Sequence, residues 1–194
     1  MKKKVLAVVG SPRKNGNSVR MVKEAFQAFA EEEYEKTIIY LRDYKYSSCI
    51  GCEKCAGEKR CPVNDDMQKI YPILEQAEVL IFASPVYNYN ITSWMKSFID
   101  RLYCYYDYSE DRRSWKCGLG KDRPVGLLVV GEQDDPKYMG FTLEAMKLPL
   151  KDLEFKIVGE LVVTGKFKAG VVKDDETAMR KAYQLGMDLR QHLE

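Results

Sequence analysis

The chain has 194 residues, 45% of them hydrophobic, so it is long enough for one well-packed domain and short for two. Its 31 basic and 29 acidic residues are interspersed and leave a formal net charge of +2, which argues against a nucleic-acid partner. The apolar run after Lys2, Lys3 and Lys4 is short, so we expect neither a signal peptide nor a membrane-spanning helix, and we predict a cytoplasmic protein.

The N-terminal part of the chain is predicted to form a strand, a polar loop and a helix. Val5 to Val9 is a β-branched apolar run bounded by glycine, which is typical of a strand buried on both faces of a parallel sheet. The loop from Gly10 to Ser18 follows, and apolar residues then recur at helical spacing as far as Phe29. Because Asn17 or Ser18 is expected to cap this helix, its N-terminal amide groups should face the loop.

The loop itself is dense in groups that donate hydrogen bonds to phosphate. Its glycines free backbone N–H groups, and its side chains supply hydroxyls, amides and a guanidinium. It has neither the GxGxxG spacing of a dinucleotide fold nor the G-K-[ST] ending of a P-loop, so NAD in a Rossmann pocket and ATP are not expected. The loop favours an anion site over a simple Gly-rich turn, with the candidate residues Ser11, Arg13, Asn15, Gly16, Asn17 and Ser18.

The rest of the chain alternates between strand and helix patterns. Asp65 or Asn64 is expected to cap the second helix, with Gln68 returning a hydrogen bond in a capping box. The later elements are predicted as strands over 36–41, 78–84, 123–131 and 155–164, and helices over 92–103, 137–153 and 174–192, with an exposed turn at 166–170. This alternation predicts one α/β domain over 1–194, a doubly wound five-stranded parallel sheet in the order 2-1-3-4-5 with helices on both faces.

In that strand order the ligand crevice lies at the carboxyl ends of the first and third strands, where the winding direction reverses. The loops that meet there are 10–18, 84–90 and, on the neighbouring strand, 131–135. A flat heteroaromatic ring bordered by backbone groups and a tyrosine suits such a crevice. The candidate residues beyond the first loop are Pro85, Val86, Tyr87, Asn88 and Gly131.

Four cysteines lie close together in the non-periodic segment 45–66. Cys49, Cys52 and Cys55 are separated by two residues each, and Cys61 follows at a longer spacing. The short spacers are typical of runs that bind a [4Fe-4S] cluster, whereas zinc sites usually present two well-separated pairs. The pattern favours an iron–sulfur cluster on these four thiolates, and zinc or unligated thiols stay open as alternatives.

Two further cysteines, Cys104 and Cys117, flank an aromatic and charged insertion at 103–122. Two isolated cysteines offer too few ligands for another redox centre, so this insertion is expected to form a subunit contact or a lid over the ligand. The single histidine, His192, lies near the C-terminus, which leaves no imidazole triad or imidazole metal site. No catalytic acid, base or nucleophile is predicted.

The motifs together resemble a known family. Gly10-Ser-Pro-Arg-x-x-Gly-Asn-Ser18, Ser84-Pro-Val-Tyr87 and Lys96-Ser-Phe-Ile-Asp-Arg101 resemble the flavodoxin-like NADPH-dependent FMN reductases, although Val130-Gly-Glu-Gln133 stands where members often carry Thr-Gly-Gly. The spaced cysteines followed by Asp65-Asp-Met67 resemble the iron–sulfur flavoprotein branch of that family.

This resemblance implies FMN held through its phosphate by the first loop, and a [4Fe-4S] cluster on the four spaced cysteines. It also implies a homo-oligomer, a dimer or tetramer, in which the cluster of one subunit lies near a neighbour's flavin. The expected function is electron transfer, with a redox partner such as a ferredoxin or NAD(P)H and with the chemistry supplied by the cofactors. Two alternatives stay open: a cluster-free NAD(P)H-dependent FMN or quinone reductase, and a non-enzymatic flavin-binding module.

Overall fold

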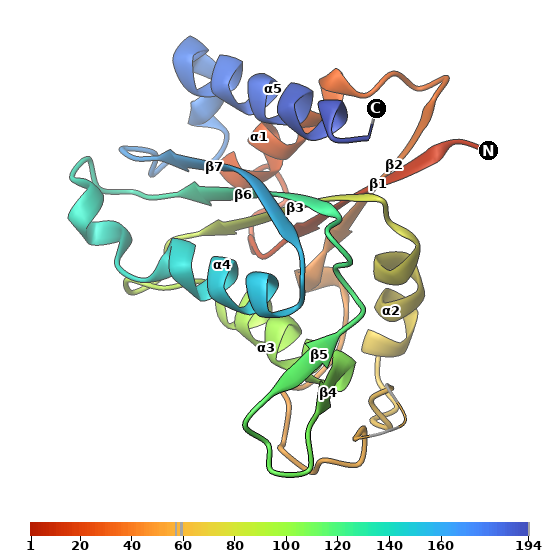
Figure 1. The fold of residues 1–194 in the computed structure, drawn as a ribbon. Coiled ribbons are helices and arrows are strands. Elements are labelled where there is room, and N and C mark those ends of the chain that lie inside the picture. Colours follow the sequence, from red (N-terminus) through yellow and green to blue (C-terminus); the bar gives the residue numbers. More distant parts are fainter. Residues whose placement is uncertain (57, 59, 194) are drawn as a thin grey trace.

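A computed structural model of the chain describes residues 1–56, 58 and 60–193, so residues 57 and 59 of the predicted cysteine segment lie outside the described part. A sheet of parallel strands in the order β2-β1-β3-β6-β7 forms its centre (Figure 1). Its strands are β1 (Lys3–Val9), β2 (Tyr34–Tyr40), β3 (Val79–Pro85), β6 (Pro124–Val130) and β7 (Lys156–Val163). The predicted order 2-1-3-4-5 is confirmed.

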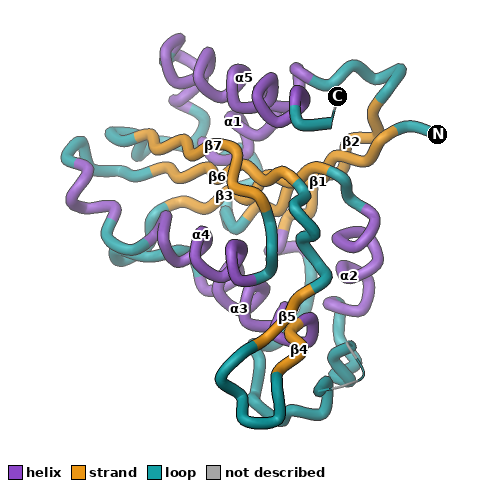
Figure 2. The backbone as a smooth tube through the Cα atoms, viewed as in Figure 1, coloured by secondary structure: helices purple, strands orange, loops and turns teal. Residues whose placement is uncertain are grey.

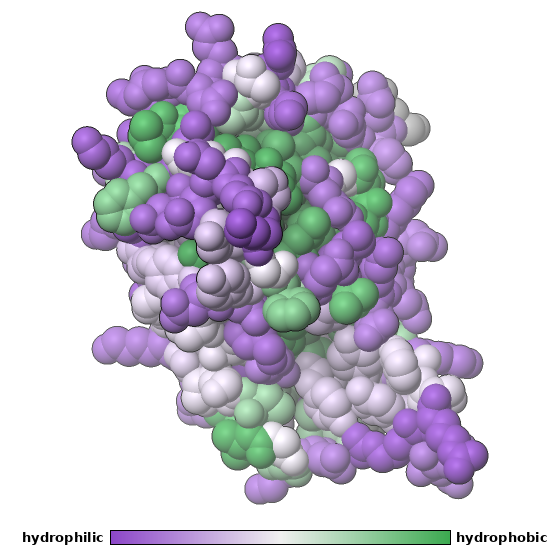
Figure 3. All heavy atoms as spheres, turned by 90° about the vertical axis from the view of Figure 1, so that its left-hand side faces the viewer, coloured by the Kyte–Doolittle hydropathy of each residue, from purple (hydrophilic) through white to green (hydrophobic). Residues whose placement is uncertain are grey.

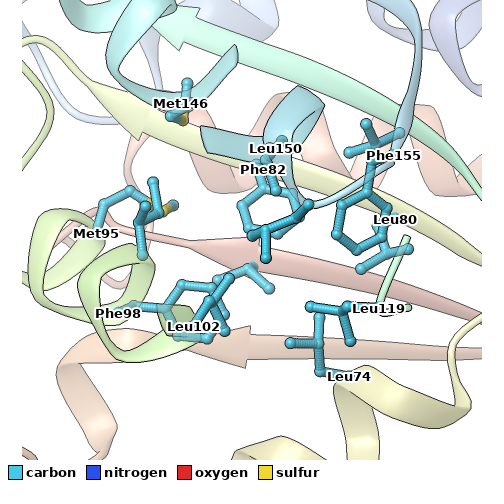
Figure 4. Close-up of a cluster of buried hydrophobic side chains, with 14 of the residues drawn as sticks. Leu74, Leu80, Phe82, Met95, Phe98, Leu102, Leu119, Met146, Leu150 and Phe155 are labelled. Carbon is cyan, nitrogen blue, oxygen red and sulfur yellow. The ribbon is translucent and has the colours of Figure 1, made fainter. Parts of the chain in front are cut away.

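Helices cover both faces of the sheet, as Figures 1 and 2 show. One face carries α1 (Asn17–Ala25) and α5 (Glu176–Gln191), and the other carries α2 (Met67–Gln76), α3 (Ser93–Arg101) and α4 (Thr142–Asp152). Because successive strand residues point to opposite faces, Leu80 and Phe82 of β3 enter one hydrophobic cluster and Ile81 and Ala83 enter the other. Figure 4 shows the first cluster, where Phe82 lies among side chains of α3 and α4. This double burial explains the continuous apolar strand runs.

Two predicted helices differ from those observed. The first ends as an α-helix at Ala25 and continues as a 3-10 turn, Phe26–Ala28. The helix predicted over 137–153 is divided into a 3-10 turn, Pro136–Met139, and α4. Gly140 lies between them at a φ of 54°, and a side chain there would meet the backbone of the loop after β3 at 2.3 Å. Close approach of these two loops therefore interrupts the helix.

The insertion at 103–122 contains a feature that the sequence pattern did not predict, an antiparallel hairpin of β4 (Tyr106–Tyr108) and β5 (Trp115–Cys117). Tyr108 pairs with Trp115 across the two strands. Arg112 at the hairpin tip donates to Glu53 of the cysteine segment at 3.0 Å. The hairpin and the cysteine segment therefore lie side by side, beyond α3 in Figure 1.

Within the described ranges, every helix is too short or too polar to cross a membrane.

Candidate functional site

The first loop leaves the sheet at the predicted place. The Gly10 N–H donates to the carbonyl oxygen of Ala83 at 2.8 Å, which joins the start of this loop to β3. The N-cap of α1 is Gly16, in an extended conformation and without a side-chain cap, so the prediction that Asn17 or Ser18 caps the helix was wrong. The free N–H groups of the first helical turn still lie at this loop, and they are the groups that bind anions at helix N-termini.

The side chain of Asn17 has a different role from the one expected of a phosphate donor. It is buried, and its Nδ2 donates to the carbonyl oxygens of Lys166 and Lys168, at 3.0 Å each. Its Oδ1 accepts from the backbone N–H of Val172 at 3.1 Å. Since both ends of the amide are engaged, Asn17 fastens segment 166–172 to the first loop, and only its backbone N–H is available to an anion.

Segment 166–168, predicted to be an exposed turn, is therefore part of the site. Arg13 Nη1 donates to the carbonyl oxygen of Phe167 at 2.6 Å, and its guanidinium lies over the Phe167 ring at 5.6 Å. These partners are separated by 154 positions in the chain. No local pattern could have found them, because the contact depends on how β7 is placed in the sheet.

Two adjoining hollows lie at the carboxyl ends of the strands. The smaller, of about 70 Å³, is lined by the first loop, the loop after β3, and residues 130, 132, 166 and 167. The larger, of about 410 Å³, extends from it over Asn88, Gly131 and Tyr138, and Val86 and Glu132 line both. Figure 3 looks onto this side of the molecule, where green hydrophobic groups are scattered among purple hydrophilic ones.

These hollows bring together nearly all the predicted cofactor residues. The smaller is lined by Ser11, Arg13, Gly16, Asn17, Ser18, Pro85, Val86 and Tyr87, and the larger by Val86, Asn88 and Gly131. Asn15 lines neither of the two. Glu132 was not predicted as a site residue, although it occupies the third loop at the position where the family motif differs.

The loop after β3 forms a tight turn that presents aromatic edges. The backbones of Tyr87 and Asn90 exchange hydrogen bonds of 2.8 and 3.0 Å, and the two residues between them, Asn88 and Tyr89, have positive φ values of 47° and 63°. Such values at both central positions define the tight hairpin turn of primed type. Tyr89 lies beside Tyr138, with ring centroids 6.2 Å apart. A flat ring can therefore lie against exposed aromatic edges at the mouth of the hollow.

The cysteine segment lies between β2 and α2 and places its four thiols in one neighbourhood. Cys55 is buried, Cys61 is half-buried, and Cys49 and Cys52 are exposed. Burial raises the pKa of the Cys55 thiol, and the neighbouring thiols of Cys61, Cys49 and Cys52 raise it further. Among the described residues, no three cysteine, histidine or acidic side chains are gathered at metal-binding distances. Four cysteine thiols in one segment are the type of donor that an iron–sulfur cluster takes.

The other two cysteines, Cys104 and Cys117, lie in different surroundings. Cys104 is buried against the cysteine segment, where burial raises its pKa to about 12 and Cys55 and Cys61 are close enough to contribute. Cys117 lies apart, beside a hollow of about 720 Å³ at the amino-end side of the sheet. The sequence pattern does not distinguish these two cysteines, but of the two only Cys104 borders the four spaced cysteines.

The helix that follows the segment begins one residue later than predicted. Its N-cap is Asp66, which makes no side-chain cap, while Asp65 Oδ1 accepts from the backbone N–H of Met67 at 3.1 Å. Gln68 does not complete a capping box. Its Nε2 donates to the carbonyl oxygens of Cys61 and Val63, at 2.7 and 2.9 Å, and so holds the end of the cysteine segment against α2.

Comparison with known proteins agrees with this arrangement. Residues 3–135 match the family described as NADPH-dependent FMN reductase. A protein named iron-sulfur flavoprotein from Archaeoglobus fulgidus is 35% identical over 191 residues, covering 98% of this chain and 80% of that protein. Another of that name from Methanocaldococcus jannaschii is 40% identical over 98 residues, so this match spans 50% of the chain and 51% of that relative.

The fold is shared with the NAD(P)H:quinone oxidoreductase from Methanothermobacter marburgensis, with a TM-score of 0.73 at 15% identity over 97% of this chain and all of that one. The chain belongs to the NADPH-dependent FMN reductase family, in the branch that contains the proteins named iron–sulfur flavoproteins, and its class is that of FMN-dependent oxidoreductases.

Proposed function

We propose that this protein is an electron-transfer oxidoreductase that uses FMN and a [4Fe-4S] cluster. The main support for this proposal is that one domain, over 1–194, contains two separate candidate sites. Hollows suited to a phosphate and a flat ring adjoin at the winding reversal of the sheet, and four thiols lie in one segment outside it, with Cys55 buried among them. Bound FMN would exchange one or two electrons, and the cluster would relay single electrons.

The first loop would bind the flavin phosphate mainly through the backbone. Asn17 and Ser18 supply N–H groups of the first helical turn, Ser11 and Ser18 supply hydroxyls, and Arg13 supplies the positive charge, while the Gly16 N–H donates to the Arg13 carbonyl oxygen at 3.1 Å and shapes the turn. Ser11 Oγ already accepts from the Arg13 N–H at 3.3 Å, which shapes the loop before a ligand arrives. The ring would lie along residues 85–88 and Gly131, with exposed Tyr87 at its edge.

The cluster would be held by Cys49, Cys52, Cys55 and Cys61. The two exposed thiols, Cys49 and Cys52, would move toward the buried Cys55 as the cluster assembles, since a site of this kind gains much of its structure from the metal. Iron–sulfur ligation also suits free thiols in a reducing compartment, so we infer a cytoplasmic location. A homo-oligomer, dimer or tetramer, would bring a neighbour's flavin close to the cluster, and a ferredoxin or NAD(P)H would exchange electrons with the protein.

One observation favours a second candidate, a cluster-free NAD(P)H-dependent FMN or quinone reductase. The four thiols are close, but they are not gathered at liganding distances in the part of the chain that the structure describes. In this alternative the flavin site would work alone and the cysteine segment would have a structural role.

The two candidates differ in iron content. Protein purified without oxygen is analysed for iron, acid-labile sulfide and flavin, and the flavin released by heat is identified by mass. We expect FMN, because no adenosine-binding motif accompanies the phosphate loop, together with four iron and four sulfide per chain, as the cluster formula requires. FMN without iron after anaerobic reconstitution would leave only the cluster-free reductase.

A further inference from the structure

Arg101, the last residue of α3, is the largest fully buried side chain in the described part of the molecule, with only 1% of its side chain exposed. Charged residues are rarely buried unless they are paired, because removing a charge from water is costly. Its partner is Asp65, which accepts from both terminal nitrogens of the guanidinium, at 2.6 and 3.1 Å. This two-point contact holds Arg101 in one orientation.

The pair of Arg101 and Asp65 holds together the two ends of the cysteine segment, which we call its base. Arg101 Nη1 also donates to the carbonyl oxygen of Ser47 at 3.0 Å, and the Ser47 N–H donates to Asp65 at 3.3 Å. Ser47 precedes Cys49, and Asp65 follows Cys61, so one guanidinium binds both ends of the segment that carries the four cysteines. Burial raises the pKa of Asp65, but hydrogen bonds from Arg101, Ser47 and Met67 outweigh burial and hold that pKa below its usual value, so the carboxylate stays charged.

Helix α3 connects this base to the flavin hollow. At its start, Thr92 Oγ1 donates to the carbonyl oxygen of Gly10 at 2.8 Å and accepts from the Met95 N–H at 3.3 Å. At its end stands Arg101. The helix has nine residues, so these two attachments lie about 14 Å apart along its axis. A rigid helix therefore has the phosphate loop at one end and the ends of the cysteine segment at the other.

One N–H group of Arg101 makes no hydrogen bond in this network. Its buried Nε has no hydrogen-bond partner among the described residues. The Arg101 carbonyl oxygen accepts from Tyr71 Oη at 3.1 Å and from Cys104 Sγ at 3.5 Å, which anchors its backbone as well. The backbone and the guanidinium of Arg101 are therefore both fixed at the ends of the cysteine segment.

We propose that Arg101 is the positioning residue of the cysteine segment: together with Asp65, it binds both ends of the segment to α3. The inference rests on the proposed cluster. It differs from a purely stabilising ion pair, because it predicts an effect on iron retention. Residues that support metal ligands in this way typically change metal affinity about tenfold to a hundredfold when they are replaced.

The test uses two variants of the full chain. Arg101→Lys keeps the charge but cannot bind Asp65 and Ser47 together. Arg101→Met combined with Asp65→Asn removes both charges while leaving an acceptor for the Met67 N–H, so that no buried charge is left unpaired. Arg123→Lys is the control, since Arg123 is half-buried and also donates to backbone carbonyl oxygens, those of Leu74 and Glu75, away from the cysteine segment.

In both Arg101 variants we expect FMN at the wild-type level, while the chelator concentration that removes half of the iron falls by about tenfold or more. The double variant removes a cation and an anion together, so the net charge near the segment is unchanged and the reduction potential of the remaining cluster should stay near that of wild type. The control should change neither FMN content nor iron retention. Wild-type iron retention in the double variant would overturn the proposal.

A second readout does not depend on the cluster. Trypsin can cleave the metal-free protein after the exposed residues Lys54 and Arg60, and release of the segment's ends should speed this cleavage in the double variant. If wild-type protein takes up no iron, the proposed function fails, and the digestion alone decides whether Arg101 holds the segment. Equal digestion rates for wild type and the double variant would refute that role.

Discussion

The two candidate sites are built in opposite ways. The flavin hollows lie on loops that leave core strands directly, and their side chains are already fixed by contacts such as those of Asn17 with segment 166–172. The cysteine segment lies outside the sheet, is closed at its base by Asp65 and Arg101, and leaves Cys49 and Cys52 exposed. The first site is therefore formed before its ligand binds, whereas the second would obtain its final arrangement from the proposed cluster.

The free energy that forms each site has a different source. Folding of the sheet orders the loops after β1 and β3, because their first residues belong to its hydrogen-bond network. The described residues of the cysteine segment make no hydrogen bonds to the sheet strands, so ligation of the proposed cluster would have to contribute the remainder. Loss of the cluster should then affect the arrangement of the cysteine segment severely, whereas loss of FMN should affect the flavin site little.

The largest effect is expected from replacing a cysteine of the cluster. Cys55→Ser removes the one buried member of the four, and iron content should fall to near zero or to a converted cluster while FMN stays bound. Iron, sulfide and flavin analysis measures this. Cys117→Ser is the control and should retain full iron content, because Cys117 lies on β5 and lines the hollow at the amino-end side of the sheet. Loss of FMN together with iron in Cys55→Ser would show that the two sites are not independent.

The converse change is Arg13→Ala in the flavin site. A charge-assisted hydrogen bond contributes about 1.5–3 kcal/mol, so the Kd for FMN should rise about tenfold or more, with iron content unchanged. Fluorescence titration of flavin-free protein measures the Kd. Lys23→Ala on the exposed side of α1 supplies a charge-matched control. An unchanged Kd in Arg13→Ala would contradict the proposal that the first loop binds the flavin phosphate.

Asn17→Ala is expected to weaken FMN binding less than Arg13→Ala does. It should instead lower the stability of the folded protein. The change leaves two carbonyl oxygens and the Val172 N–H without partners, which costs about 1–3 kcal/mol of unfolding free energy, or about 2–4 °C in Tm per kcal/mol. Calorimetry of the flavin-free protein should show the lower Tm before any ligand is present. A Tm equal to wild type would mean that the site is not formed in advance.

The smallest effect is expected from Tyr87→Ala. Tyr87 is exposed and borders the smaller hollow, so its loss should shift the visible spectrum or the reduction potential of the flavin without releasing it. Absorbance spectra and a redox titration measure the two quantities. Identical spectra and potentials would place the ring away from the loop after β3.

Local sequence patterns predicted the parts of the molecule that depend on local residues. The double-sided burial of β3 was visible in its apolar run, and Thr92 at the start of α3 was expected and is its N-cap. The contacts of Asn17 were not predictable, because its partners lie about 150 positions away and their approach is decided by packing. Arg101 was noticed only within a motif, since nothing in a single sequence shows that an arginine will be buried.

The cysteine segment was predicted by spacing alone, which indicates ligand type but not how far the thiols are gathered before the metal binds. The hairpin of β4 and β5 was missed because its strands are three residues each and too short for a period-2 pattern to be recognised.

The most direct measurement is the EPR spectrum of the reduced protein after anaerobic reconstitution with iron and sulfide, taken together with its FMN content. We predict that FMN is bound both before and after reconstitution, and that the reconstituted protein gives the signal of a reduced [4Fe-4S] cluster on Cys49, Cys52, Cys55 and Cys61. Protein that binds FMN but takes up no iron and gives no such signal would contradict this prediction.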